Sequence, residues 1–135
     1  MELIDTHCHL DVAEFDPDRP RVISAARAAG VAEMVVPAIQ AAGWPGLLDL
    51  CAGEKGLYPA LGMHPVFLEE HRDHHLEELE RLLAIVRPVA VGEIGLDYFL
   101  RELDRERQGG LFEDQLSIAA AAGLPVLIHA RKSHD

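Results

Sequence analysis

The sequence predicts an α/β fold built on a parallel sheet. Two observations lead to this prediction: short apolar runs recur along the chain, and a stretch with helical spacing of apolar residues separates each run from the next. Strict alternation of strand and helix is typical of βα units, whose helices return the chain to begin the next parallel strand. With 135 residues, 49% of them hydrophobic, the chain is long enough to form one domain with a buried core.

Five apolar runs are the expected strands, at residues 3–7, 34–36, 57–61, 89–91 and 126–128. Their apolar composition is typical of parallel strands that are fully buried. The runs begin about 31 residues apart on average, so eight such units would occupy about 250 residues, the usual length of a TIM (β/α)₈ barrel. We therefore expect a truncated barrel with the first five strands and four helices. Because no helix follows the last run, we expect residues 1–135 to be the N-terminal portion of a single barrel domain.

Four helices are expected between these strands, at residues 22–29, 44–51, 76–86 and 112–120. Asp18 precedes the first helix, and Pro20 lies in its first turn, where proline is tolerated. Gly30 and Gly123 follow the first and fourth helices. Because glycine readily adopts the left-handed conformation that ends many helices, we expect both glycines to act as C-terminal caps.

Charge and composition narrow the classes of function. The chain contains no apolar run of the roughly 20 residues that cross a bilayer and begins without a signal-peptide pattern, so we expect a cytoplasmic protein with no membrane partner. Cys8 and Cys51 are accordingly expected to be free thiols. The net charge of −11 argues against binding duplex nucleic acid through a basic surface. No obligate protein partner is indicated, and no phosphate-binding loop or serine-hydrolase elbow is present.

His7 and His9 are the first candidate metal ligands. They end the first apolar run, and residues two apart on a strand point to the same face, so both imidazoles are expected to reach one ion. The alternative is a pair of solvated or capping histidines. The neighbouring Asp5 and Asp11, and the placement at the end of a strand where barrel enzymes carry their working residues, favour the metal site.

Glu93 and His129 follow the fourth and fifth apolar runs and are the expected partners of that site. Glu93 lies between glycines among apolar residues, where an unpaired carboxylate is costly. An arginine would satisfy it, but a metal bridged by its two oxygens is favoured. His129 is either a satisfied core histidine or a ligand, and the other candidates favour ligation. Asp97 is equally compatible with hydrogen bonding to a ligand and with capping a loop.

Other polar residues are expected to meet substrate or solvent. His64 follows the third run and is expected to contact substrate instead of metal, with a role in a turn as the alternative. Arg131 and Lys132 are expected to bind a phosphate at the same barrel mouth, unless they belong to a solvated loop. The stretch 69–75 is rich in histidine and acidic residues, but it precedes a predicted helix and is interpreted as a solvated face.

Five segments together resemble the TatD family of metal-dependent hydrolases: 5–11, 62–65, 92–97, 108–115 and 129–135. They occur in order along the whole chain. The resemblance implies a TIM-barrel hydrolase of the amidohydrolase-like superfamily with metal-dependent deoxyribonuclease activity. It also implies that His7 and His9 hold one ion, that Glu93, the candidate catalytic residue, bridges two, and that His129 holds the second. The family pattern includes a further histidine and a late aspartate, both beyond residue 135.

The expected function is therefore hydrolysis of phosphodiester bonds by water that one or two divalent ions activate. Imidazole and carboxylate accept several metals, so zinc, manganese, magnesium and nickel all remain candidates. The acidic net charge favours single-stranded DNA or a small phosphodiester as substrate. Two alternatives remain open: a metal-dependent hydrolase of a small ester, lactone or amide, or an inactive metal-binding fragment with an incomplete ligand set.

Overall fold

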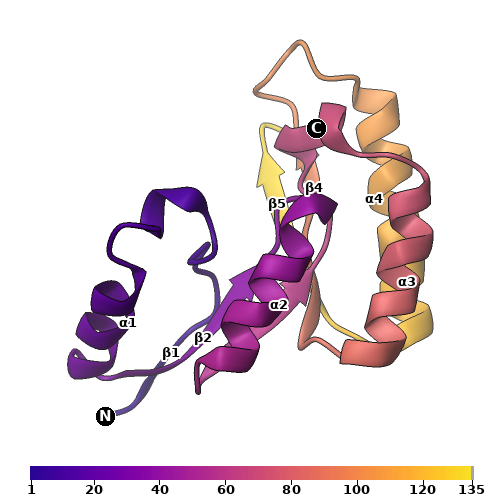
Figure 1. Ribbon diagram of the computed structural model, residues 1–135. Coiled ribbons are helices and arrows are strands. Elements are labelled where there is room, and N and C mark those ends of the chain that lie inside the picture. The colour runs from indigo at the N-terminus through magenta and orange to yellow at the C-terminus, as the bar shows by residue number, and fades with distance from the viewer. Residues whose placement is uncertain (135) are drawn as a thin grey trace.

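In the computed structural model, which describes residues 1–134, five parallel strands form one sheet in the order β1-β2-β3-β4-β5. The strands are β1 (Leu3–Asp5), β2 (Val31–Pro37), β3 (Leu57–Leu61), β4 (Ala90–Asp97) and β5 (Val126–Arg131). The α-helices are α1 (Arg19–Ala28), α2 (Trp44–Gly53), α3 (His74–Val86) and α4 (Arg105–Ala122). Short 3₁₀ helices span Ala13–Phe15, Ala41–Gly43 and Pro65–Glu70. The predicted alternation is confirmed, and Figure 1 shows the resulting half-barrel.

The helix ends follow the local signals in the sequence. Gly30 and Gly123 have φ of 100° and 66°, as expected for glycines that end helices. Helix α4 is longer than predicted and begins at Arg105, because the Asp104 side chain accepts a hydrogen bond from the Arg107 amide at 3.1 Å and caps the helix there. The prediction missed residues 105–111 because glycines at 109–110 interrupt the apolar spacing.

The core lies between the sheet and the helices. Helix α2 packs against β3 and helix α4 against β4. Trp44 is fully buried, and its indole nitrogen donates to the Gly62 carbonyl at 3.2 Å, which ties α2 to the segment that follows β3. Leu47, Leu79 and Ile94 are also fully buried. This packing holds the ends of β3 and β4 in place, and those ends carry candidate site residues.

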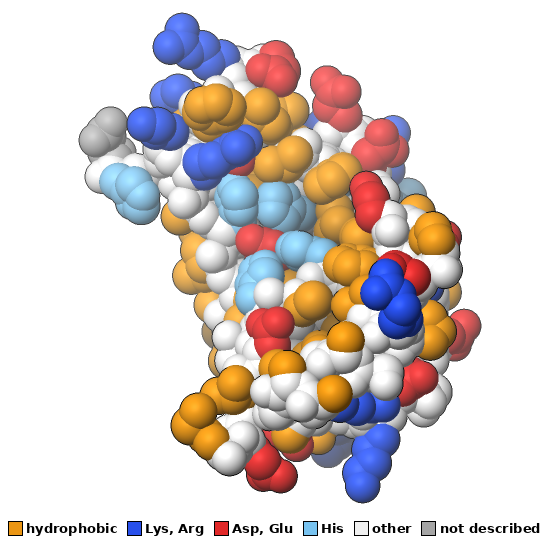
Figure 2. All heavy atoms as spheres, turned by 90° about the vertical axis from the view of Figure 1, so that its left-hand side faces the viewer, with side chains coloured by type: hydrophobic (Ala, Val, Ile, Leu, Met, Phe, Trp, Pro, Cys, Tyr) orange, Lys and Arg blue, Asp and Glu red, His pale blue; other side chains and the backbone are white. Residues whose placement is uncertain are grey.

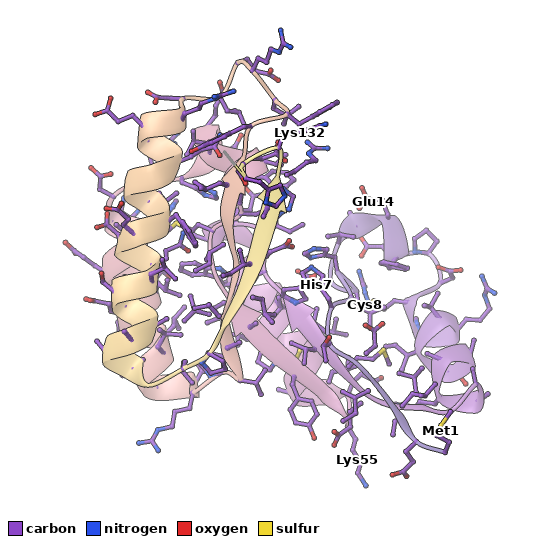
Figure 3. All side chains as sticks on the ribbon, turned by 180° about the vertical axis from the view of Figure 1, so that it is seen from behind. Met1, His7, Cys8, Glu14, Lys55 and Lys132 are labelled. Atoms are coloured by element: carbon purple, nitrogen blue, oxygen red, sulfur yellow. The ribbon has the colours of Figure 1, made fainter. Side chains whose placement is uncertain are left out.

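The prediction that every strand is fully buried is correct for most of β4 but wrong for the edge strands. All three residues of β1 are exposed, and Ile128 in β5 is 56% exposed. Seen from behind in Figure 3, β5 lies in front, and no helix of residues 1–134 covers that face. Burial of a strand depends on what covers it, and apolar composition alone does not report that. None of the described helices combines the length and the apolar character needed to cross a bilayer.

Candidate metal centre

Histidine side chains surround a carboxylate in a hollow of the face drawn in Figure 2. Two groups of potential ligand atoms share Glu93: one contains His7 and His9, the other His64 and His129. Within each group the atoms lie within 4.8 Å of one another. The structure thus brings together the four predicted ligands, and it places His64 beside them. Asp135, the last residue of the segment 129–135, lies outside the described residues.

His7 and His9 lie in a turn, and the prediction that they share a strand face is wrong. Strand β1 ends at Asp5, whose Oδ1 accepts a hydrogen bond from the His7 amide at 3.0 Å. The two Nε2 atoms are 3.3 Å apart, and the His9 Nδ1 lies 3.0 Å from the Pro37 carbonyl oxygen. Because a carbonyl only accepts, Nδ1 of His9 carries a proton and Nε2 is the atom directed at the site.

Glu93 lies inside β4 and not after the strand as predicted, because β4 continues to Asp97. Its Oε2 is 2.9 Å from Nε2 of both His7 and His9. Its Oε1 is 3.3 Å from Nδ1 of His129. Among the described residues its charged partners are histidines and include no arginine. The two oxygens therefore face different histidines, which is the arrangement that a bridging carboxylate requires.

The charges of this cluster are strongly coupled. Burial favours a raised pKa for Glu93, but hydrogen bonds from His64 and His9 outweigh it and hold the pKa of that carboxyl far below its usual range. The hydrogen bond with Glu93 raises the pKa of His9. Glu93 is therefore a carboxylate throughout the physiological range, available to imidazolium or to a cation.

Asp97 makes both kinds of hydrogen bond that the sequence left open, one with a candidate metal ligand and one that caps its own loop. Its Oδ2 accepts hydrogen bonds from Nε2 of His129 and Nε of Arg131, both at 2.8 Å, and its Oδ1 accepts from the Phe99 amide at 3.0 Å. Burial acts to raise the pKa of Asp97, but these bonds lower it overall. Since the carboxylate fixes the proton of His129 on Nε2, Nδ1 presents a lone pair toward Glu93. Like Glu93, His129 lies within its strand.

In His64 the nitrogen that faces Glu93 is the protonated one, which is the reverse of His129. Nδ1 of His64 accepts a hydrogen bond from the Val66 amide at 3.1 Å, so the neutral ring carries its proton on Nε2. That Nε2 faces Oε2 of Glu93 at 3.6 Å. A protonated nitrogen donates and does not ligate a metal. His64 is therefore close enough to be counted with the ligands, while its hydrogen bonds suit a donor to a substrate oxygen.

Buried polar residues that the sequence analysis did not assign to the site support it. Oε1 of Gln108 accepts from the Asp97 amide at 2.8 Å, and Oε1 of Gln115 accepts from the Met63 amide at 2.8 Å. These glutamines are seven residues apart and so lie on one face of α4. Polar side chains at that spacing on an apolar face are a signal that could have identified them.

His71 corrects the interpretation of residues 69–75 as a solvated face. It is almost completely buried, and its Nε2 lies 2.7 Å from the carbonyl oxygen of His64. Burial lowers the pKa of His71, which keeps the ring neutral so that Nε2 donates. The surrounding charges hide this histidine in the sequence, because nothing local distinguishes it from its exposed neighbours.

The donor set fits a divalent metal. Imidazole nitrogen and carboxylate oxygen suit zinc, manganese, nickel and related ions, and the outer contacts of His9 and His129 are those that orient metal-ligating histidines. Cys8 and Cys51 are free, as predicted, and neither belongs to the two groups of potential ligand atoms among the described residues; burial raises the pKa of the Cys8 thiol. The first group is more exposed than the second, in which Glu93 and His64 are buried.

Comparison with known proteins identifies the family of the chain. The family model described as TatD related DNase matches residues 4–135. The chain is 43% identical to the "uncharacterized metal-dependent hydrolase YjjV" of Escherichia coli K12 over 134 residues. This alignment covers 98% of the present chain and 52% of that protein. It is 33% identical over 134 residues to the "3'-5' ssDNA/RNA exonuclease TatD" of Erwinia tasmaniensis, again covering 52% of that protein.

Solved structures show the same architecture. The crystal structure of the YjjV protein superimposes with a TM-score of 0.93 over 98% of this chain and 52% of that one. A TatD family hydrolase from Entamoeba histolytica, 23% identical, shares the fold with a TM-score of 0.86 over 98% of this chain and 51% of its own. The chain therefore spans about half the length of these relatives and of both solved structures.

Proposed function

We propose that this chain, which belongs to the TatD related DNase family of metal-dependent hydrolases, forms the first half of one barrel domain that cleaves phosphodiester bonds in DNA. The observation that carries the proposal is the placement of Glu93. One of its oxygens faces His7 and His9 and the other faces His129, so a single buried carboxylate joins two sets of nitrogen ligands.

In this proposal His7 and His9 hold one divalent ion, Glu93 bridges two, and His129 holds the second. When bound, such ions supply Lewis acidity that lowers the pKa of a water molecule and offsets negative charge on phosphoryl oxygens. The protein's own contribution is to keep Glu93 ionised and the imidazoles of His9 and His129 in the right tautomer. The chemistry of the donor set accepts zinc, manganese, magnesium or nickel.

His64 and Arg131 are proposed to bind the scissile phosphate. His64 presents the proton on Nε2 toward the centre of the site, where a phosphoryl oxygen would accept it. Arg131 is held by Asp97 through Nε, which leaves its two terminal nitrogens available for a paired interaction with phosphate. The name of the Erwinia relative, a single-stranded DNA and RNA exonuclease, supports a polynucleotide substrate for the whole domain.

The first test replaces His7 and His9 with alanine in the complete protein. Loss of both nitrogens should remove one ion and lower metal-dependent cleavage of single-stranded DNA by on the order of 10³-fold or more. Metal analysis should report fewer bound ions. His74→Ala, at an exposed position on α3, is the matched control and should leave both measurements unchanged. Undiminished cleavage by the double variant would contradict the assignment.

The second candidate function uses the same metal centre to hydrolyse an ester, lactone or amide bond of a small molecule. It stays open because the barrel fold and the metal ligands do not determine the substrate. Comparing DNA with a small carboxylic ester, a lactone and an amide distinguishes the two. Cleavage of the small substrates with no cleavage of DNA would favour this alternative.

A further inference from the structure

A basic and aromatic surface lies beside the metal centre, where the loop after β4 meets the end of β5. We call it the mouth patch; it consists of Tyr98, Phe99, Arg101, Arg105, Arg131 and Lys132. All but Arg131, together with His134, line one open hollow. Figure 2 shows basic side chains around hydrophobic ones immediately above the histidine cluster.

The charge of the mouth patch is opposite to that of the chain. The protein has a net charge of −11, yet four of its 12 lysines and arginines gather here. Within residues 1–134, Arg101, Arg105 and Lys132 are exposed and form no ion pair. Acidic residues of the same loop do not line the hollow, and Asp104 caps α4 instead. The patch therefore supplies local attraction for an anion on a molecule that repels anions at long range.

Aromatic rings lie among these charges. Phe99 is 57% exposed, and the guanidinium of Arg131 lies 4.5 Å from its ring centroid. Arg105 lies 4.4 Å from the centroid of Tyr98. Exposed aromatic rings and guanidinium planes are the surfaces on which unpaired bases stack, and neighbouring cations bind the phosphates of the same strand. An acidic peptide would use the charges, but it would gain nothing from the rings.

The patch is joined to the metal centre through one carboxylate. Oδ2 of Asp97 accepts hydrogen bonds from both His129 and Arg131. Lys132 has a φ of 56°, a conformation that is uncommon for residues other than glycine and is often associated with functional sites. In Figure 3, Lys132 lies at the same end of the sheet as His7, and Lys55 lies at the opposite end.

We propose that the mouth patch binds single-stranded polynucleotide next to the metal centre, with a base stacked on Phe99 and adjacent phosphates bound by Arg101, Arg105 and Lys132. This inference rests on the proposed nuclease function and adds the residues that hold the strand beyond the scissile phosphate. A duplex fits poorly, because its bases are already stacked on one another and the acidic remainder of the chain repels the second strand.

The test measures binding of a fluorescein-labelled oligothymidylate of about ten nucleotides to the complete protein, with EDTA present to prevent cleavage. Phe99→Leu keeps the apolar bulk but removes the stacking surface, so affinity should fall about tenfold, while Phe99→Trp should retain it. The double variant Arg101→Ala/Arg105→Ala should flatten the plot of log affinity against log salt by about 1.4, since each phosphate contact on single strands contributes about 0.7. Lys55→Ala should leave the slope unchanged.

Hydrolysis of bis(4-nitrophenyl) phosphate separates this inference from the proposed function. That ester carries one phosphate and no bases, and the variants leave the proposed metal ligands, His64 and Arg131 in place, so each variant should hydrolyse it within about twofold of the unmodified protein. An unmodified protein that hydrolyses no phosphodiester would overturn the proposed function, whereas the binding measurements would still decide the patch. Unchanged oligonucleotide affinity in Phe99→Leu, or equal binding of polyglutamate, would overturn the patch as a polynucleotide site.

Discussion

The two sides of the candidate metal centre are held by different means. On the turn side, His7 and His9 follow an exposed strand of three residues, and their side chains are 40% and 31% exposed. On the strand side, Glu93 and His129 lie within β4 and β5, with 7% and 20% exposed. Because buried groups depend on every hydrogen bond around them, the strand side should be the more sensitive to substitution.

The two sides also differ in the groups that orient their histidine rings. The ring of His9 is oriented by a backbone carbonyl, that of Pro37, which no substitution removes. The ring of His129 is oriented by the side chain of Asp97, which is itself held by Gln108 and is completely buried. The turn side should therefore tolerate nearby side-chain changes better than the strand side, where the ring of His129 depends on another side chain.

The largest effect is expected from Gln108→Leu. The glutamine accepts from the Asp97 amide and donates to the Asp97 carbonyl at 3.0 Å, so leucine leaves two buried backbone groups unpaired. At about 1–3 kcal/mol for each group, the free energy of unfolding should fall by about 2–6 kcal/mol. Urea denaturation of the complete protein measures this change.

Glu113→Leu is the matched control, because it places the same leucine at an exposed position of α4. Its effect should stay within about 0.5 kcal/mol. If Gln108→Leu were equally mild, α4 would not support the strand side through this glutamine, and the proposed contrast between the sides would lose its main cause.

The next effect is expected from Asp97→Asn. An asparagine oxygen still accepts from the Phe99 amide, but its NH₂ group then faces the N–H of His129 and no longer orients that ring. Loss of such an outer contact typically weakens metal affinity 10- to 100-fold. Calorimetric titration should show one weakened class of metal ions and one unchanged class.

Pro37→Ala is the corresponding control on the turn side, because alanine keeps the carbonyl that orients His9. Metal affinity should remain within about twofold. Equal weakening of both classes in Asp97→Asn would show that the two sides act as one unit, in contradiction to the comparison.

The fold was predictable from the sequence because local patterns of apolar residues indicate its strands and helices. Apolar runs and helical spacing depend on residues a few positions apart, so all five strands and four helices were found. Their limits were not, since the extension of β4 to Asp97 and of β5 to Arg131 depends on pairing between the two strands. The exposure of Ile4 and Ile128 likewise depends on what lies above the sheet.

The candidate site was predictable as a set of residue types but not as a geometry. Histidines and acids at the ends of apolar runs pointed to His7, His9 and Glu93 without any contact information. Which ring nitrogen of His64 and of His129 carries the proton is determined by their hydrogen-bond partners, the Val66 amide and the Asp97 carboxylate. The sequence does not show these pairings. The burial of His71 depends on how its segment folds back toward His64, seven residues earlier, whose carbonyl oxygen its ring contacts. Such contacts have no signature along the chain.

The smallest effect is expected from Asp5→Ala, which tests the turn side directly. The bond from the His7 amide to Asp5 Oδ1 is exposed, so its loss should cost about 0.5–1.5 kcal/mol and weaken the first metal-binding class about two- to tenfold. Asp5→Asn keeps an acceptor oxygen and should stay within about twofold. If Asn were as harmful as Ala, the charge of Asp5 would be the stabilising feature. If neither variant changed the affinity, the turn would be held by the bond from the Cys8 amide to the Val35 carbonyl at 3.1 Å, and the turn side would depend on backbone alone.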